Sequence, residues 1–137
     1  MMAVDEIADG LWLPGRAEAE ETISWLMSEG RPAFALAVLA TEVPRINEQF
    51  GYQAGDRVLA TVARRLANAA GPSRELFRWS ATSFLIVSRS LHPVSQASKV
   101  NGATSMVFGV RPEEHPRALI DRIDHYIAAR LACFEAA

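Results

Sequence analysis

The sequence contains a single cysteine, Cys133, so no disulfide can form within the chain. It also lacks the run of about 20 apolar residues that a membrane-spanning helix needs, and it has no basic segment followed by an apolar one, as a signal peptide would. We therefore expect a cytoplasmic protein that does not insert into a membrane. Because Cys133 falls in an apolar helical pattern, we expect a buried small side chain there rather than a reactive thiol.

The sequence also has little net charge. Its 14 basic and 16 acidic side chains give a net charge of -2 at pH 7, whereas domains that bind nucleic acids usually carry a basic excess. The three histidines lack the close spacing with cysteine or carboxylate residues that a zinc site requires: His92, His115 and His125. We therefore expect no nucleic-acid partner, no metal site and no cofactor.

The length and hydrophobic pattern indicate one folded unit. A chain of 137 residues that is 50% hydrophobic can build one core but not two, so we expect a single domain over residues 1–137. Apolar residues at intervals of three and four predict helices at residues 16–29, 56–70 and 116–134, with a short helix near 94–100. Apolar runs of strand length predict strands at residues 33–40 and 104–110, and a pair joined by a tight turn at 76–87. This order predicts an α/β (α+β) sandwich with a central, mainly antiparallel sheet flanked by helices.

A family resemblance appears between residues 46 and 56. This segment, Ile-Asn-Glu-Gln-Phe-Gly-Tyr-Gln-Ala-Gly-Asp, resembles the I-N-D-x-x-G-H-x-x-G-D segment of GGDEF domains, the diguanylate cyclases. Residues 13–16, Leu-Pro-Gly-Arg, are similar to the family's L-P-N-R opening, and residues 105–110 resemble its V-S-I-G-V strand. The likeness runs in the same order over about residues 8–134. It implies a palm-like nucleotide-cyclase fold and a place in bacterial cyclic di-GMP signalling.

The resemblance also implies that the family's metal-binding groups are missing. A diguanylate cyclase holds divalent metal on carboxylates so that one GTP can attack the α-phosphate of another. The family's D-x-D segment falls on residues 39–41, Leu-Ala-Thr, and its R-Y-G-G-D-E-F signature falls on residues 78–84. The two glycines and two acids of that signature turn are replaced by Ser80, Ala81, Thr82 and Ser83.

Two further groups of the family are replaced. The lysines that bind phosphate fall on Pro44 and Leu131, with Arg130 beside the second as a weak substitute. The R-x-x-D site that binds the cyclic product falls on residues 71–74, Gly-Pro-Ser-Arg. The resemblance therefore implies a degenerate GGDEF domain that has no catalytic residues and is not an active enzyme.

Asn47 and Asp56 survive at positions that contact the guanine base in the family. A structural interpretation is also open, with Asn47 as a turn or cap residue and Asp56 as the N-cap of a helix that begins at Arg57. We favour the structural interpretation, because a base contact without phosphate or metal contacts implies weak or absent nucleotide binding.

The expected function is that of a regulatory module that binds another protein. Trp79, beside the altered turn, is either a core anchor or an interaction surface for that partner. Self-association into a homodimer through the apolar helices is a further alternative. Two other functions are considered: a non-catalytic sensor of GTP or cyclic di-GMP that uses Asn47 and Asp56, and an enzyme whose chemistry has moved to Glu42 and Glu75.

Overall fold

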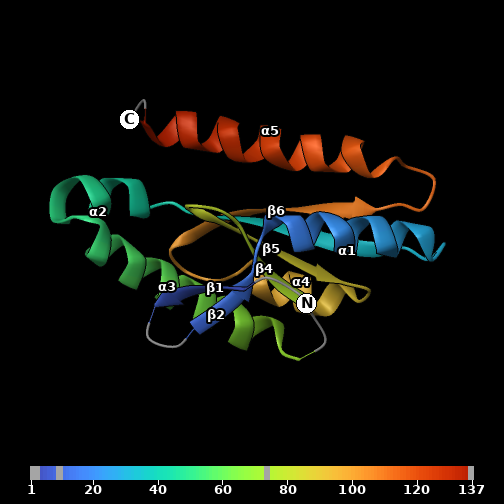
Figure 1. The fold of residues 1–137 in the computed structure, drawn as a ribbon, viewed down its shortest axis with the longest axis horizontal. Helices are drawn as coiled ribbons and strands as arrows, with labels where there is room; N and C mark the ends of the chain where they lie inside the picture. The colour runs from blue at the N-terminus through green and yellow to red at the C-terminus, as the bar shows by residue number, and fades with distance from the viewer. Residues whose placement is uncertain (1–3, 9–10, 73–74, 136–137) are drawn as a thin grey trace.

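The computed structural model describes residues 4–8, 11–72 and 75–135, and these form two small layers of helices around a sheet (Figure 1). The elements follow one another in the order β1 (Val4–Ala8), β2 (Leu11–Pro14), α1 (Arg16–Ser28), β3 (Ala33–Ala40), α2 (Val43–Phe50), α3 (Tyr52–Ala70), β4 (Glu75–Ser80), β5 (Ser83–Ser88), α4 (Leu91–Ala97), β6 (Ala103–Val110) and α5 (Pro116–Glu135).

The main sheet has the strand order β4-β5-β3-β6, and every neighbouring pair is antiparallel. This confirms the predicted fold class, a mainly antiparallel sheet flanked by helices. β3 lies inside the sheet between β5 and β6, which explains its nearly uninterrupted apolar sequence. β1 and β2 form a separate two-stranded hairpin.

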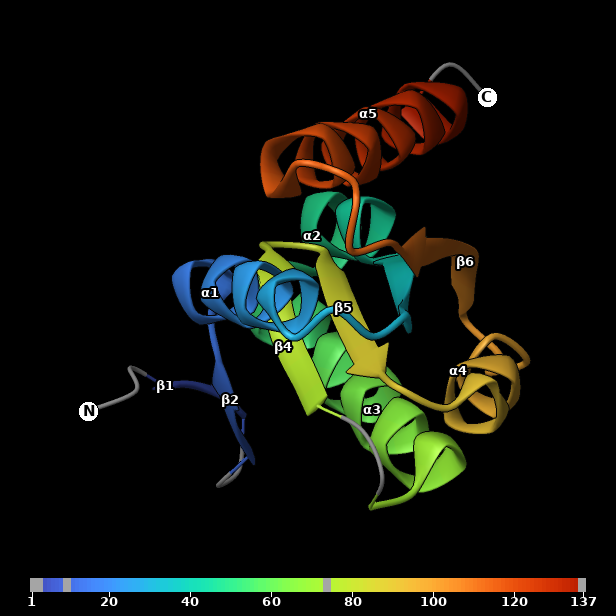
Figure 2. The same cartoon turned by 90° about the vertical axis from the view of Figure 1, so that its right-hand side faces the viewer.

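Each face of the sheet is covered by its own helices (Figure 2). Alternate residues of β3 point to opposite faces. Ala35, Ala37 and Leu39 join a core cluster with α1 and α5, whereas Leu36 and Val38 join a second cluster with α3 and α4. The two cores fix β3 from both sides, so the loop after Ala40 leaves the sheet at a defined position.

The structure corrects the prediction at several points. α3 begins at Tyr52, four residues before the predicted start, and the preceding α2 was not predicted as a helix. The two helices are separated by Gly51, whose φ of 87° is accessible mainly to glycine.

Cys133 is exposed on α5, so the expectation of a buried side chain was wrong. None of the helices in the described ranges is long and apolar enough to cross a membrane.

Candidate functional site

The end of β3 and the β4–β5 turn lie next to each other. Leu39 pairs with Ser83 across the two strands, and the backbone N–H of Ala40 donates a hydrogen bond to the carbonyl oxygen of Thr82 at 2.9 Å. The predicted tight turn is confirmed, because β4 ends at Ser80 and β5 begins at Ser83. The fold therefore brings together the two segments that the family resemblance assigns to metal and phosphate binding.

The polar groups of this turn bind one another. The hydroxyl groups of Ser80 and Ser83 form a short hydrogen bond, and the side chain of Ser83 is fully buried. The guanidinium of Arg78 donates to the carbonyl oxygens of Ser80 at 3.3 Å and Ala81 at 3.1 Å. Neutral hydroxyl groups that already have a partner are poor ligands for Mg²⁺, which prefers carboxylate and phosphate oxygens.

Asn47 packs against a glycine of the next helix. A Cβ atom added to Gly55 would lie 1.6 Å from the Oδ1 atom of Asn47, so the side chain of Asn47 occupies the space above this glycine. The Oδ1 atom is buried and has no hydrogen-bond partner. A buried amide oxygen without a partner costs free energy, and a bound group with a donor would satisfy it.

Asp56 follows Gly55, and its side chain is exposed. The structure places Asp56 inside α3 and Asn47 inside α2, so neither residue is a turn or cap residue. The prediction that Asn47 is a turn or cap residue and that Asp56 is a helix N-cap was therefore wrong. The reason is that the helix continues through Gly55, which Asn47 covers, instead of beginning after it.

Trp79 is buried, which contradicts its proposed role as an exposed interaction surface. Only 2% of the residue is exposed, and its indole Nε1–H donates to the Oδ1 atom of Asp124 at 2.9 Å. The guanidinium of Arg16 lies 4.3 Å from the centre of the tryptophan ring. The core-anchor alternative is the one that the structure supports, because Trp79 joins α1, β4 and α5.

The charged groups Arg16 and Asp124 beside Trp79 shift each other's pKa values. Burial acts to raise the pKa of Asp124, but hydrogen bonds from Arg16 and Trp79, together with the charges of Arg16 and Arg117, outweigh it and hold the pKa below its ordinary value. The hydrogen bond to Asp124 likewise raises the pKa of Arg16. These shifts belong to an ion pair that ties helices together, so they do not mark a catalytic acid or base.

The two carboxylates considered for relocated chemistry do not meet. Glu42 follows β3 and lies 3.9 Å from Arg45, whereas Glu75 begins β4 and pairs with Val87 at the far end of the hairpin. Five residues of strand separate Glu75 from the turn, about 17 Å at 3.3 Å per residue. No group of three or more histidine, cysteine, aspartate or glutamate residues that could hold a metal occurs in the part of the chain that the structure describes.

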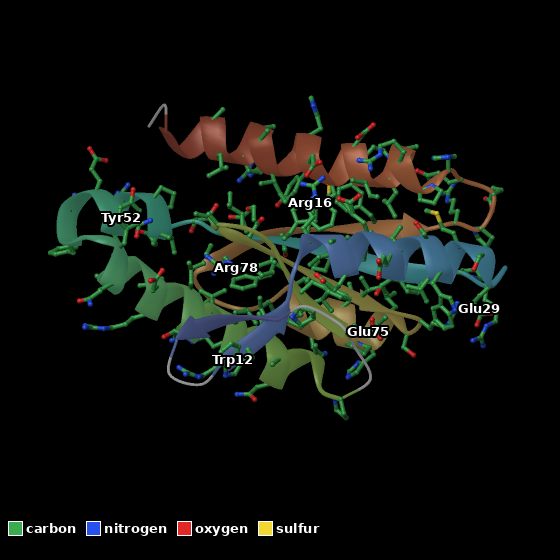
Figure 3. The ribbon with its side chains drawn as sticks, viewed as in Figure 1. Trp12, Arg16, Glu29, Tyr52, Glu75 and Arg78 are labelled. Carbon is green, nitrogen blue, oxygen red and sulfur yellow. The ribbon has the colours of Figure 1, made fainter. Side chains whose placement is uncertain are left out.

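Two exposed aromatic residues were not predicted from the sequence. Phe50 ends α2 and Tyr52 begins α3, on either side of Gly51, and they are 72% and 77% exposed. They lie on the same pair of helices as Asn47 and Asp56, and Figure 3 shows Tyr52 at the outer end of this pair. The only signal in the sequence was the pair of aromatic letters around a glycine, which does not by itself distinguish exposed from buried side chains.

Comparison with known proteins agrees with this geometry. The four-stranded antiparallel sheet flanked by helices, with the end of β3 hydrogen-bonded to the hairpin turn, defines an α+β sandwich. The family model described as diguanylate cyclase, GGDEF domain, matches residues 9–119. The chain therefore belongs to the GGDEF-domain family.

Individual relatives are more distant. The chain is 29% identical over 106 residues to the diguanylate cyclase DgcN of Escherichia coli (strain K12), a match that covers 75% of this chain and 26% of DgcN. The chain thus spans about a quarter of the length of that relative.

Two solved structures show the same fold. The GGDEF domain of FimX from Pseudomonas aeruginosa superposes with a TM-score of 0.76 at 15% identity, covering 96% of this chain and 94% of that chain. The LapD S helix-GGDEF-EAL protein of Vibrio cholerae, bound to c-di-GMP, gives a TM-score of 0.68 at 21% identity and covers 92% of this chain and 33% of that chain.

Proposed function

We propose that this chain is a catalytically inactive GGDEF domain that regulates cyclic di-GMP-linked signalling by binding another protein. One observation carries the proposal. Where β3 meets the hairpin turn, the side chains are those of Leu39, Ala40, Ser80 and Ser83, and the last two are hydrogen-bonded to each other. This junction offers no carboxylate to hold a divalent cation against GTP phosphates.

GTP turnover tests the inactive state directly. Purified protein is incubated with GTP and Mg²⁺ or Mn²⁺, and the products are separated by chromatography. We expect no cyclic di-GMP above the level of a protein-free control. Production of cyclic di-GMP that scales with protein concentration would show that the proposal is wrong.

Phe50 and Tyr52 are the candidate partner-binding surface. Large exposed aromatic side chains supply much of the binding energy at protein interfaces, and these two are among the most exposed hydrophobic residues described. We expect a Phe50→Ala, Tyr52→Ala variant to lose capture of the partner by at least tenfold. Trp25→Ala, which removes an exposed tryptophan from α1, is the matched control and retains capture.

A non-catalytic nucleotide sensor is the second candidate function. Its support is the Oδ1 atom of Asn47, which is buried without a partner beside the exposed Asp56. Isothermal titration with GTP and with cyclic di-GMP, each with Mg²⁺, tests it. Micromolar binding that disappears in Asn47→Ala, Asp56→Ala but persists in Asn68→Ala supports the sensor. No binding by a folded sample, with partner capture unaffected by the double variant, supports the regulatory module.

A further inference from the structure

β6 forms one border of the main sheet, and no strand of the described ranges pairs with its outer edge (Figure 2). Its eight residues, Ala-Thr-Ser-Met-Val-Phe-Gly-Val, include no charged residue and no proline. They pair with β3 in an unbroken register from Ala103 to Val110. An uncharged edge without a bulge presents its free N–H and C=O groups to any further strand.

The opposite border of the sheet carries features that prevent such pairing. β4 contains Glu75 and Arg78, and its register with β5 shifts between Arg78 and Ser80. Charges and bulges are usual protections of an edge strand; β4 has both, whereas β6 has no charged residue and no shift of register, which indicates that the β6 edge has a partner.

A groove of 590 Å³ lies beside this open edge, between β6 and α5. Met106 and Phe108 line it from the strand, while Tyr126 and Ala129 line it from the helix. Asp121 and Arg122 of the same helix also line the groove. Met106 is 46% exposed, and the hydroxyl of Tyr126 is buried without a hydrogen-bond partner. An added strand would place alternate side chains over this groove while its backbone extends the sheet.

We propose that β6 pairs antiparallel with β6 of a second copy, which joins two four-stranded sheets about a twofold axis. The strand itself argues for this occupant. In a twofold pair each strand faces its own sequence, so any charge near the centre would meet a like charge, and β6 has none. Met106 of each copy also supplies an apolar side chain for the groove of the other.

Sedimentation velocity across a series from micromolar to millimolar protein, without nucleotide, tests this pairing. We expect the monomer of 15.0 kDa to convert to a species of twice that mass as concentration rises. Met106→Lys places like charges across the twofold axis and is expected to weaken the dimer about tenfold or more, which corresponds to about 1.4 kcal/mol. Trp12→Lys changes a similarly exposed residue, 54% against 46% for Met106, on β2 beside the opposite border of the sheet, and is expected to leave the dimer intact.

Hydrogen exchange provides a second measurement that needs no substitution. Backbone amides of β6 that point away from β3 are expected to become protected as concentration rises, while amides of β4 do not change. A monomer at every concentration, or a dimer that loses affinity in Trp12→Lys but not in Met106→Lys, would overturn the pairing. Either result leaves the proposed function standing, because that function concerns a different surface and a different partner.

Discussion

Arg16 and Asp124 form a bidentate ion pair that joins the first residue of α1 to the middle of α5. The two guanidinium nitrogens Nη1 and Nη2 lie 2.7 Å and 2.6 Å from the two carboxylate oxygens. Figure 3 shows Arg16 between the two helices. Because the same carboxylate accepts the indole N–H of Trp79, the pair also fixes β4 just before the hairpin turn. The geometry of the turn thus depends on a contact between residues 108 positions apart in the sequence.

Asp124→Asn removes the charge from this contact and retains its shape. We expect the free energy of unfolding to fall by about 1 kcal/mol, a modest value because the side chains are more than a third exposed and solvent screens the pair. Urea denaturation measures the change. Asp121→Asn on the same helix is the control, since that carboxylate is 67% exposed and lies 3.8 Å from Arg117. Equal effects of the two substitutions would contradict the role given to Asp124.

The same pair predicts how stability depends on pH. The pKa of Asp124 is lower in the folded protein than the ordinary value of 3.8, so below pH 4 the unfolded chain binds more protons than the folded one. The contribution is fully present above the unfolded pKa and is lost as pH falls through the folded pKa. We expect the difference in unfolding free energy between the wild type and Asp124→Asn to shrink as pH is lowered from 6 to 3. A difference that stays constant over this range would show that the charge is not responsible.

Gly55 tests the contact between α2 and α3. Replacing a helical glycine with alanine normally stabilises a helix by up to about 1 kcal/mol, but here the new Cβ atom would lie 1.6 Å from Asn47 Oδ1. We expect Gly55→Ala to destabilise the protein by about 1–2 kcal/mol, because Asn47 must leave its position. The double variant Asn47→Ala, Gly55→Ala should recover most of this loss. Thermal unfolding of the two single variants and the double variant gives the coupling energy directly.

The sequence predicted the elements that have strong local patterns. β3 was predicted at its observed bounds, and the antiparallel hairpin was placed correctly, because apolar runs and turns of this kind are local signals. The burial of Trp79 was not settled, because it depends on Arg16 and Asp124, which are distant in the sequence. The start of α3 was missed because Gly55 resembles a helix breaker until Asn47 is seen to cover it.

The candidate site was also predictable only as far as local sequence motifs define it. The order of the motifs along the chain matched residues 39–41 and 78–84 to two segments of one family's site. The fold brings these two segments side by side. The exposed pair Phe50 and Tyr52 was not predicted, since exposure is a property of the assembled fold. Neither the groove beside β6 nor the open edge of β6 could be inferred before the strand order was known.

Restoring acids to the turn alone is expected not to restore activity. In Thr82→Asp, Ser83→Glu, the neighbouring end of β3 still consists of Leu39 and Ala40, so a cation would gain ligands from one side only. We expect no cyclic di-GMP from GTP with Mg²⁺ or Mn²⁺.

The same variant should also lose stability. Ser83 is fully buried, so a glutamate there carries a desolvation cost of about 2 kcal/mol or more. Ala81→Asp adds a charge to the same turn at an exposed position and is expected to leave the unfolding free energy within about 0.5 kcal/mol of the wild type. Cyclic di-GMP production by the double variant would mean that the turn alone had been limiting, and that the side chains at the end of β3 are compatible with catalysis.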